Sequence, residues 1–225
     1  MEQLAIFVEG QTEAIFMEKF LFAIIDRKQI KIETQRKQGK GYFQTTLAAE
    51  EENKKYFVMI ADCCNDEAVK SEMLNFFDTG RASPYKRVLG LRDVYPIPIS
   101  EITRLKDRLK EDLPHNFKIF LAIQEIEAWF IAENSHFLKV HPKLTPEFIY
   151  KETGIEIAPN IVESIYHPAE ELNKIFNTAN KEYKKKKSFL NQYVYKLDYD
   201  ELYLNLPSQV PSLGDFVTEL DSFFT

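Results

Sequence analysis

The feature that most constrains the fold of this chain is a short apolar run, Leu4–Val8, which ends directly at Glu9 and Gly10. Five successive apolar residues bounded in this way are typical of a β-strand that is buried on both faces. Thr12 is a residue type that caps helices, and Glu13 suits a first helical turn, so the next segment is predicted to be a helix. A buried strand that turns directly into a helix indicates an α/β fold.

The pattern of an apolar run followed by a carboxylate returns three times. The runs are Tyr56–Ala61, Lys86–Leu91 and Phe117–Ile123, and the acids that follow them are Asp62, Asp93 and Glu127. Helical segments separate the runs, and this alternation predicts a mostly parallel sheet flanked by helices. The carboxyl ends of parallel strands meet at one edge of the sheet, where open α/β folds bind their ligands.

Two further elements are predicted between the first two runs. Ile30–Thr34 alternates apolar and polar residues, as a strand does, and Tyr42–Lys55 is predicted to be a helix. The connection Gln35–Gly41 is basic and contains glycine. It offers Arg36, Lys37 and Lys40 as ligands for phosphates, with Lys37 and Lys40 expected to bind nucleic acid, and the alternative is a solvated loop.

Carboxylates at the ends of neighbouring strands repel one another and are costly to bury unless a cation or a proton compensates them. We therefore expect a divalent metal ion, Mg²⁺ or Mn²⁺, at this edge of the sheet. The expected metal ligands are Glu9, Asp62, Asp66, Asp93 and Glu127. The alternative is that these side chains cap turns and helices or pair with neighbouring basic residues.

Two strings carry a resemblance to a known family. Glu9–Glu13 reads EGQTE, and Glu127–Phe130 reads EAWF. The first resembles the EGxTE motif of the nuclease branch of the Toprim superfamily, which includes the overcoming-lysogenisation-defect nucleases. The second resembles a phrase of an uncharacterised bacterial Toprim-like family. The second Toprim motif is usually Asp-x-Asp, whereas this chain has Asp62, Cys63 and Cys64 there.

The resemblance implies a Toprim-like, metal-dependent nuclease that acts on DNA or RNA. Its catalytic residues would be Glu9, Glu13, Asp62 and Glu127. A thiol is a poor ligand for Mg²⁺, so either Asp66 replaces the missing carboxylate or the site binds metal more weakly. Members of the resembled family are often encoded beside ATPases in anti-phage loci, which implies an ATPase partner and a role in antiviral defence.

The second half of the chain has a different organisation. Prolines punctuate short helical stretches beyond residue 133, which predicts a helical extension over 134–225 after an α/β domain over 1–133. Four successive basic residues follow Tyr183, namely Lys184, Lys185, Lys186 and Lys187. Lysines beside an aromatic ring suit binding to a nucleic-acid backbone and its bases. The alternative is an exposed, positively charged helix end.

Composition narrows the possible classes of protein. A hydrophobic share of 44%, with 13% aromatic residues, excludes a disordered chain. The net charge of −6 requires any nucleic-acid-binding surface to be local. No apolar run reaches the roughly 18 residues that a membrane-spanning helix needs, and no signal peptide is visible. The two adjacent cysteines provide no disulfide framework, so a cytoplasmic protein without a membrane partner is expected.

Three functions follow from these observations. The leading one is a metal-dependent phosphodiesterase acting on nucleic acid. The second is a non-catalytic, Toprim-like binding or regulatory subunit of an ATPase, which Cys64 and the acidic composition favour. The third is hydrolysis of nucleotides or small phosphate esters by the same acids. All three functions are compatible with a monomer or a homo-oligomer.

Overall fold

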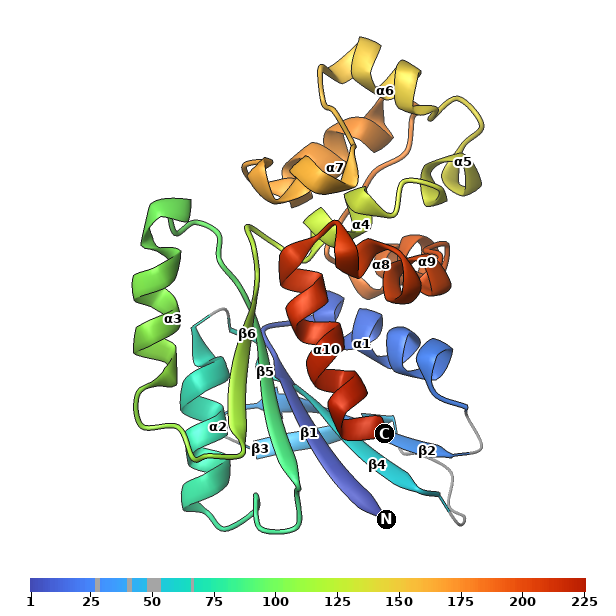
Figure 1. Cartoon of the computed structure of the whole chain (residues 1–225). Coiled ribbons are helices and arrows are strands. Elements are labelled where there is room, and N and C mark those ends of the chain that lie inside the picture. Colours follow the sequence, from blue (N-terminus) through green and yellow to red (C-terminus); the bar gives the residue numbers. More distant parts are fainter. Residues whose placement is uncertain (27–28, 40–41, 48–53, 66) are drawn as a thin grey trace. The chain divides into compact units, whose positions relative to one another are not determined.

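The computed structural model (Figure 1) describes residues 1–26, 29–39, 42–47, 54–65 and 67–225. The chain divides into two compact units. Unit 1 comprises Met1–Arg92, Ser100–Leu121 and Ser222–Thr225, and unit 2 comprises Asp93–Ile99 and Ala122–Asp221. These units do not coincide with the ranges 1–133 and 134–225, and a domain boundary at residue 133 stays a prediction.

A six-stranded, mostly parallel sheet flanked by helices confirms the predicted α/β class. In sheet order β3-β2-β4-β1-β5-β6, the strands are β3 (Tyr42–Leu47), β2 (Ile30–Gln38), β4 (Tyr56–Asp62), β1 (Glu2–Val8), β5 (Arg87–Asp93) and β6 (Phe117–Ala122). The accompanying helices are α1 (Gln11–Ile24), α2 (Ala68–Asp78) and α3 (Ile102–Lys110), and a short 3₁₀ turn, η1 (Ile99–Glu101), precedes α3.

Strand register brings two of the predicted acids to one edge of the sheet. β1 lies between β4 and β5 and runs parallel to both. Val8, the last residue of β1, is aligned with Asp62, the last residue of β4. Glu9 follows Val8 directly, so the carboxyl ends of these two strands meet as the parallel pattern predicted.

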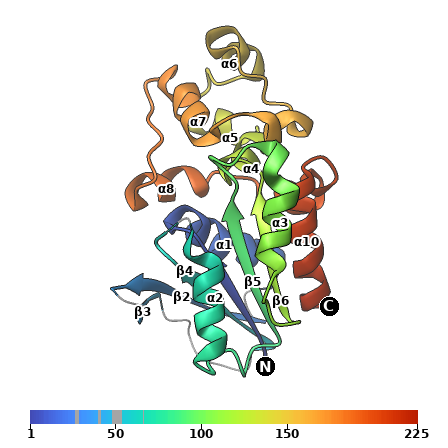
Figure 2. The ribbon, with the colours of Figure 1, turned by 90° about the vertical axis from the view of Figure 1, so that its left-hand side faces the viewer.

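Both faces of the sheet are covered within unit 1. Successive residues of a strand point to opposite faces. Ala5 and Phe7 of β1 pack in one buried cluster with Val69 and Met73 of α2. The opposite face lies against α1, which contacts β2 and β4. Figure 2 shows α2 and α3 side by side on the first face, where Lys70 donates a hydrogen bond of 2.6 Å to the main-chain oxygen of Arg108.

The helix predicted over 42–55 was wrong for its first residues. Tyr42–Leu47 forms β3, which pairs with β2 in an antiparallel hairpin. β2 itself continues to Gln38, through most of the segment predicted to be a loop. The turn between the strands includes Gly39, which has a left-handed φ of +63°. Backbone pairing with β2 and the aromatic and β-branched residues of β3 favour the strand.

Unit 2 is helical, as predicted for the second half of the chain. Its elements are α4 (Glu127–Ala132), α5 (His136–Val140), α6 (Pro146–Thr153), η2 (Pro159–Ser164), α7 (Pro168–Asn177), α8 (Lys187–Val194), α9 (Tyr199–Leu204), η3 (Leu206–Ser208) and α10 (Pro211–Phe224). Local sequence sets several of these boundaries. The Thr145 hydroxyl caps α6 by accepting a hydrogen bond of 3.2 Å from the Phe148 N–H, and Gly154 ends that helix in a left-handed conformation.

The end of α10 belongs to unit 1. The Tyr56 hydroxyl donates a hydrogen bond of 2.5 Å to the main-chain oxygen of Phe224. The rings of Phe223 and Phe224 both lie against the Tyr56 ring, at centroid distances of 5.9 and 5.0 Å. Residues 222–225 therefore complete the packing around β4. No helix in the described part of the chain is both long enough and apolar enough to cross a membrane.

Candidate functional site

Three buried carboxylates form a cluster in unit 2. Asp93, Glu125 and Glu127 each offer one oxygen, and these oxygens lie within 4.8 Å of one another. The three residues are 9%, 5% and 0% exposed. Among the described residues, this is the one group of potential metal ligands with such geometry. We refer to these three residues as the acid cluster.

A sharp turn after β6 builds the acid cluster. Asp93 is the last residue of β5, and Gln124 turns the chain after β6 with a left-handed φ of +65°. The main-chain N–H of Ile126 then donates a hydrogen bond of 3.0 Å to Oδ1 of Asp93. This bond fixes the Asp93 carboxylate against the turn that carries Glu125 and Glu127.

Glu125 is held by three donors. Its Oε2 accepts a hydrogen bond of 2.8 Å from the Ala169 N–H and lies 2.9 Å from Nδ1 of His167. Its Oε1 lies 3.1 Å from the ammonium of Lys185. Burial alone would raise the pKa of Glu125, but the Lys185 charge and the three hydrogen bonds outweigh burial and hold that pKa below its ordinary value. Glu125 is therefore a carboxylate prepared to stay ionised.

The two carboxylate oxygens of Glu127 have different surroundings. Its Oε1 accepts a hydrogen bond of 2.7 Å from the Tyr183 hydroxyl and lies 3.3 Å from the Lys185 ammonium. Its Oε2 is buried and has no hydrogen-bond partner among the described residues. Burial raises the pKa of Glu127, and the neighbouring Glu125 charge raises it further, against the opposing charge of Lys185. A cation is what this carboxyl group needs in order to ionise at low cost.

The acid cluster fits a hard divalent cation. All three side chains offer carboxylate oxygens, which are the donors that Mg²⁺ and Mn²⁺ prefer. The buried Oε2 of Glu127 supplies a further oxygen that no described group satisfies. The surrounding N–H and O–H donors orient the carboxylates, as outer-shell groups do in metal sites.

Glu9, Glu13 and Asp62 lie in unit 1, and an arginine lies beside Glu9 and beside Asp62. Glu9 and Asp62 are 5% and 3% exposed. Oε1 of Glu9 lies 3.5 Å from Nε of Arg92, and Oδ2 of Asp62 lies 3.4 Å from Nε of Arg36. Glu13 is buried in the first turn of α1. Its Oε2 lies 3.3 Å from where a Cβ on Gly10 would stand, so glycine gives this carboxylate room.

Cys64, which stands where a Toprim motif has its second aspartate, is held by hydrogen bonds from its main chain and to its side chain. The Cys64 N–H donates a hydrogen bond of 2.9 Å to Oδ1 of Asp62, and Cys64 has a left-handed φ of +56°. The Cys64 sulfur accepts a hydrogen bond of 3.2 Å from Nε of Arg36. Desolvation raises the pKa of the Cys64 thiol, so this sulfur is a neutral hydrogen-bonding group rather than a thiolate ligand.

Of the predicted metal ligands, the structure brings Asp93 and Glu127 together. Glu9 and Asp62 belong to the other unit, and their convergence with Glu127 stays a prediction. Asp66, like Lys40 among the predicted nucleic-acid ligands, lies outside the described residues.

The predicted nucleic-acid lysines have different surroundings. Lys37 forms an ion pair with Glu72, and Lys185 binds the acid cluster. Lys184 and Lys186 are exposed, and Lys184 pairs with Glu182 at 2.6 Å. The side chain of Lys187 lies outside the described part of the chain.

The stacking face expected on Tyr183 was wrong. Tyr183 is 5% exposed, and its ring lies against Phe176 and Tyr193 at centroid distances of 6.2 and 6.3 Å. Its hydroxyl serves Glu127 instead. The protein's own aromatic side chains occupy the surroundings that a nucleic-acid base would need.

Sequence reasoning missed Glu125 and His167 as site residues. A signal existed for Glu125, because it follows the fourth apolar run even more closely than Glu127 does. His167 and Lys185 contact Glu125 across 42 and 60 positions of sequence, and no local pattern marks such contacts.

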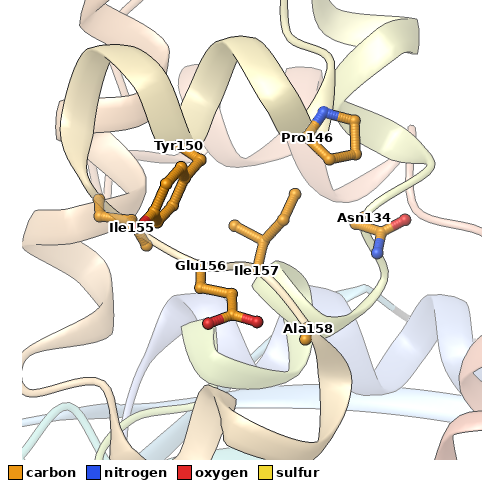
Figure 3. Close-up of a pocket in the computed structure, with 7 residues that line it drawn as sticks. All are labelled: Asn134, Pro146, Tyr150, Ile155, Glu156, Ile157 and Ala158. Atoms are coloured by element: carbon orange, nitrogen blue, oxygen red, sulfur yellow. The ribbon is translucent and has the colours of Figure 1, made fainter.

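A separate cavity of about 510 Å³ lies elsewhere in unit 2 (Figure 3). Its wall is largely apolar, with Tyr150, Ile155 and Ile157 beside the single carboxylate of Glu156. None of the predicted catalytic or metal-binding residues lines it. The acid cluster therefore stays the candidate site.

Comparison with known proteins identifies the family. Residues 8–220 match the model of a family described as a domain of unknown function, DUF4276, and the chain belongs to that family. No curated protein matches the chain.

A similar solved structure is described as "the putative cell surface hydrolase from Lactobacillus plantarum WCFS1". It shares 14% identity at a TM-score of 0.33, over 67% of this chain and 62% of that one. The match thus spans less than two thirds of that hydrolase, and a likeness at this level says nothing about the activity of this chain.

Proposed function

We propose that this chain is a divalent-metal-dependent phosphodiesterase that cleaves DNA or RNA. The observation that carries this proposal is the acid cluster of Asp93, Glu125 and Glu127, whose oxygens lie within 4.8 Å of one another. Three buried carboxylates are costly in a folded protein, and a bound cation is the usual means of compensating them.

The acid cluster would hold Mg²⁺ or Mn²⁺, which when bound polarises a phosphoryl oxygen and activates water. The chain's own residues orient the ligands. The Ile126 N–H holds Asp93, the Ala169 N–H and His167 hold Glu125, and the Tyr183 hydroxyl holds Glu127. Such preorganisation keeps ligand geometry fixed while substrate binds and leaves.

Nucleic acid is the proposed substrate for two reasons. Lys184 and Lys186 are exposed on either side of Lys185, where they are suited to phosphate contacts. The string at Glu9–Glu13 resembles the nuclease branch of the Toprim superfamily, and the string at Glu127–Phe130 resembles an uncharacterised bacterial Toprim-like family. On this proposal Glu9, Glu13 and Asp62 act in the same reaction, and an ATPase in a bacterial anti-phage system is the partner.

A second candidate is a non-catalytic Toprim-like subunit that binds or regulates the ATPase. The observation that favours it is the pairing of the Lys185 ammonium with both Glu125 and Glu127. That pairing partly neutralises the acid cluster without any metal. Cys64, which replaces the second aspartate of a Toprim motif, also favours this candidate.

The test is cleavage of single- and double-stranded DNA and RNA with Mg²⁺, Mn²⁺ or EDTA. The parent protein is expected to cleave only with metal, and Glu127→Gln is expected to lose roughly a hundredfold or more in rate. Glu133→Gln is the matched control, because Glu133 is also a buried glutamate near α4 but lies outside the acid cluster. Equal cleavage by Glu127→Gln and the parent would exclude the proposal. A parent that cleaves nothing yet retains an ATPase would favour the second candidate.

A further inference from the structure

We propose that Lys185 is a built-in competitor of the metal: its ammonium and a divalent cation bind the acid cluster in exclusion of one another. This inference rests on the metal site of the proposed function. It adds that the site can be held in a metal-free, partly neutralised form by the chain itself.

Lys185 already occupies a position between two of the carboxylates. The Lys185 ammonium lies 3.1 Å from Oε1 of Glu125 and 3.3 Å from Oε1 of Glu127, so it bridges two of the three carboxylates. A divalent ion coordinated by these carboxylates would stand about 2.0–2.1 Å from each ligand oxygen. An ammonium bridging the same two carboxylates would then lie close to the ion. Like charges at that separation repel strongly where burial lowers the dielectric.

Lys185 also compensates the buried charge of Glu127. Glu127 is fully buried, and its Oε2 has no hydrogen-bond partner among the described residues. An uncompensated buried carboxylate is strongly destabilising. Lys185 supplies the compensating charge from the segment 178–186, which connects α7 to α8. The protein thereby holds its acid cluster together in the absence of metal.

The Lys185 side chain is able to move away from the acid cluster while the neighbouring segments keep their structure. The side chain of Lys185 is 42% exposed, so it has a route to solvent. Tyr183 anchors the segment two residues before it, through a hydrogen bond of 2.9 Å from its N–H to Oδ1 of Asn173 and through its buried ring. Exchange therefore requires rotation of one long side chain and no unfolding of α7 or α8.

Calorimetric titration with Mn²⁺ tests the competition. Lys185→Met removes the ammonium and keeps a chain of similar length, and Lys184→Met is the matched control at an exposed neighbour that pairs with Glu182. Lys185→Met is expected to bind Mn²⁺ about tenfold or more tightly than the parent, within the usual range for coupled ligands. Lys184→Met is expected to match the parent. Equal affinity in all three proteins would overturn the competition and leave the metal site standing, whereas no binding in any would overturn both.

A second measurement uses the parent protein, so its outcome does not depend on whether Lys185→Met folds normally. Reductive methylation of lysines, followed by mass spectrometry, is expected to label Lys185 slowly without metal and several-fold faster with saturating Mn²⁺. Lys184 should react at the same rate in both conditions. Unchanged labelling of Lys185 in protein that calorimetry shows to be loaded with Mn²⁺ would refute the exchange. Failure of the nuclease proposal is recognised separately, as the absence of metal-dependent cleavage.

Discussion

The indole N–H of Trp129 donates a hydrogen bond of 2.8 Å to the hydroxyl of Ser212, which lies 83 positions later in the chain. Trp129 is fully buried, and its ring lies against Phe216 of α10. The Ser212 N–H in turn donates a hydrogen bond of 2.8 Å to Glu163. Trp129 stands two residues after Glu127, so this network holds the short helix that carries the fully buried acid of the cluster.

Replacement of this tryptophan is expected to be severe. Trp129→Ala should lower the free energy of unfolding by roughly 3–5 kcal/mol, because it leaves a large cavity in a packed core. Urea unfolding followed by circular dichroism measures the change without relying on the single tryptophan. Trp129→Phe should cost less, since it keeps most of the apolar surface and loses the hydrogen bond and only part of the ring. A loss below about 1 kcal/mol for Trp129→Ala would contradict the packing described.

Glu9 tests whether the acids of unit 1 take part in the reaction. Glu9→Gln is expected to abolish most cleavage, because an amide lacks the charge that a metal site requires. It should also lower the free energy of unfolding by about 1–3 kcal/mol, since it removes the negative charge that faces the partly buried Arg92. Cleavage assays and thermal unfolding check the two effects. Glu18→Gln, on the same helix that follows Glu9, is the control. Parent-level cleavage by Glu9→Gln would remove unit 1 from the mechanism.

The exposed lysines should act through the phosphate backbone. The double variant Lys184→Ala and Lys186→Ala is expected to weaken nucleic-acid binding to a similar degree for all sequences. The slope of log affinity against log salt should fall by about one for each phosphate that a lysine no longer neutralises. Mn²⁺ affinity should not change. Lys151→Ala is the control, since Lys151 is an exposed lysine of α6. An unchanged salt slope would place the phosphate-binding surface elsewhere.

The free energy of unfolding at high pH is expected to depend on Tyr85. Burial raises the pKa of Tyr85 to about 12, with a further contribution from Glu33 and opposition from Arg81. The unfolded chain loses this proton near pH 10, so between about pH 10 and 12 the folded state binds more protons. Stability should therefore fall as pH rises through this window. Tyr85→Phe should reduce the slope in urea unfolding, whereas Tyr150→Phe, at an exposed site, should not.

Much of the fold could be predicted because its signals are local. The apolar runs at Leu4–Val8 and Tyr56–Ala61 show a buried strand in five or six residues, and both form the centre of the sheet. β3 was missed because its strand character depends on pairing with β2, which no window over Tyr42–Leu47 contains. The order of the strands is likewise a property of packing between distant segments.

The same contrast between local sequence signals and contacts between distant segments applies to the candidate site. Asp93 and Glu127 could be predicted as neighbours because the carboxyl ends of parallel strands share an edge. The role of Lys185 could not be predicted, because a run of lysines has the same pattern whether it faces solvent or binds buried acids. Its contact with Glu125 spans 60 positions and exists only once α7 and α8 have packed.

The return of residues 222–225 to unit 1 has a consequence for synthesis of the protein. The hydrogen bond from Tyr56 to Phe224 spans 168 positions, and all of unit 2 lies between these two residues in the sequence. On the ribosome, β4 therefore emerges long before the phenylalanines that cover Tyr56, and its aromatic surface stays open while the helical unit is translated. Such an interval exposes a nascent chain to aggregation and to chaperones. Unit 1 begins to emerge first, but it can complete its packing only after unit 2 has been translated and residues 222–225 have emerged.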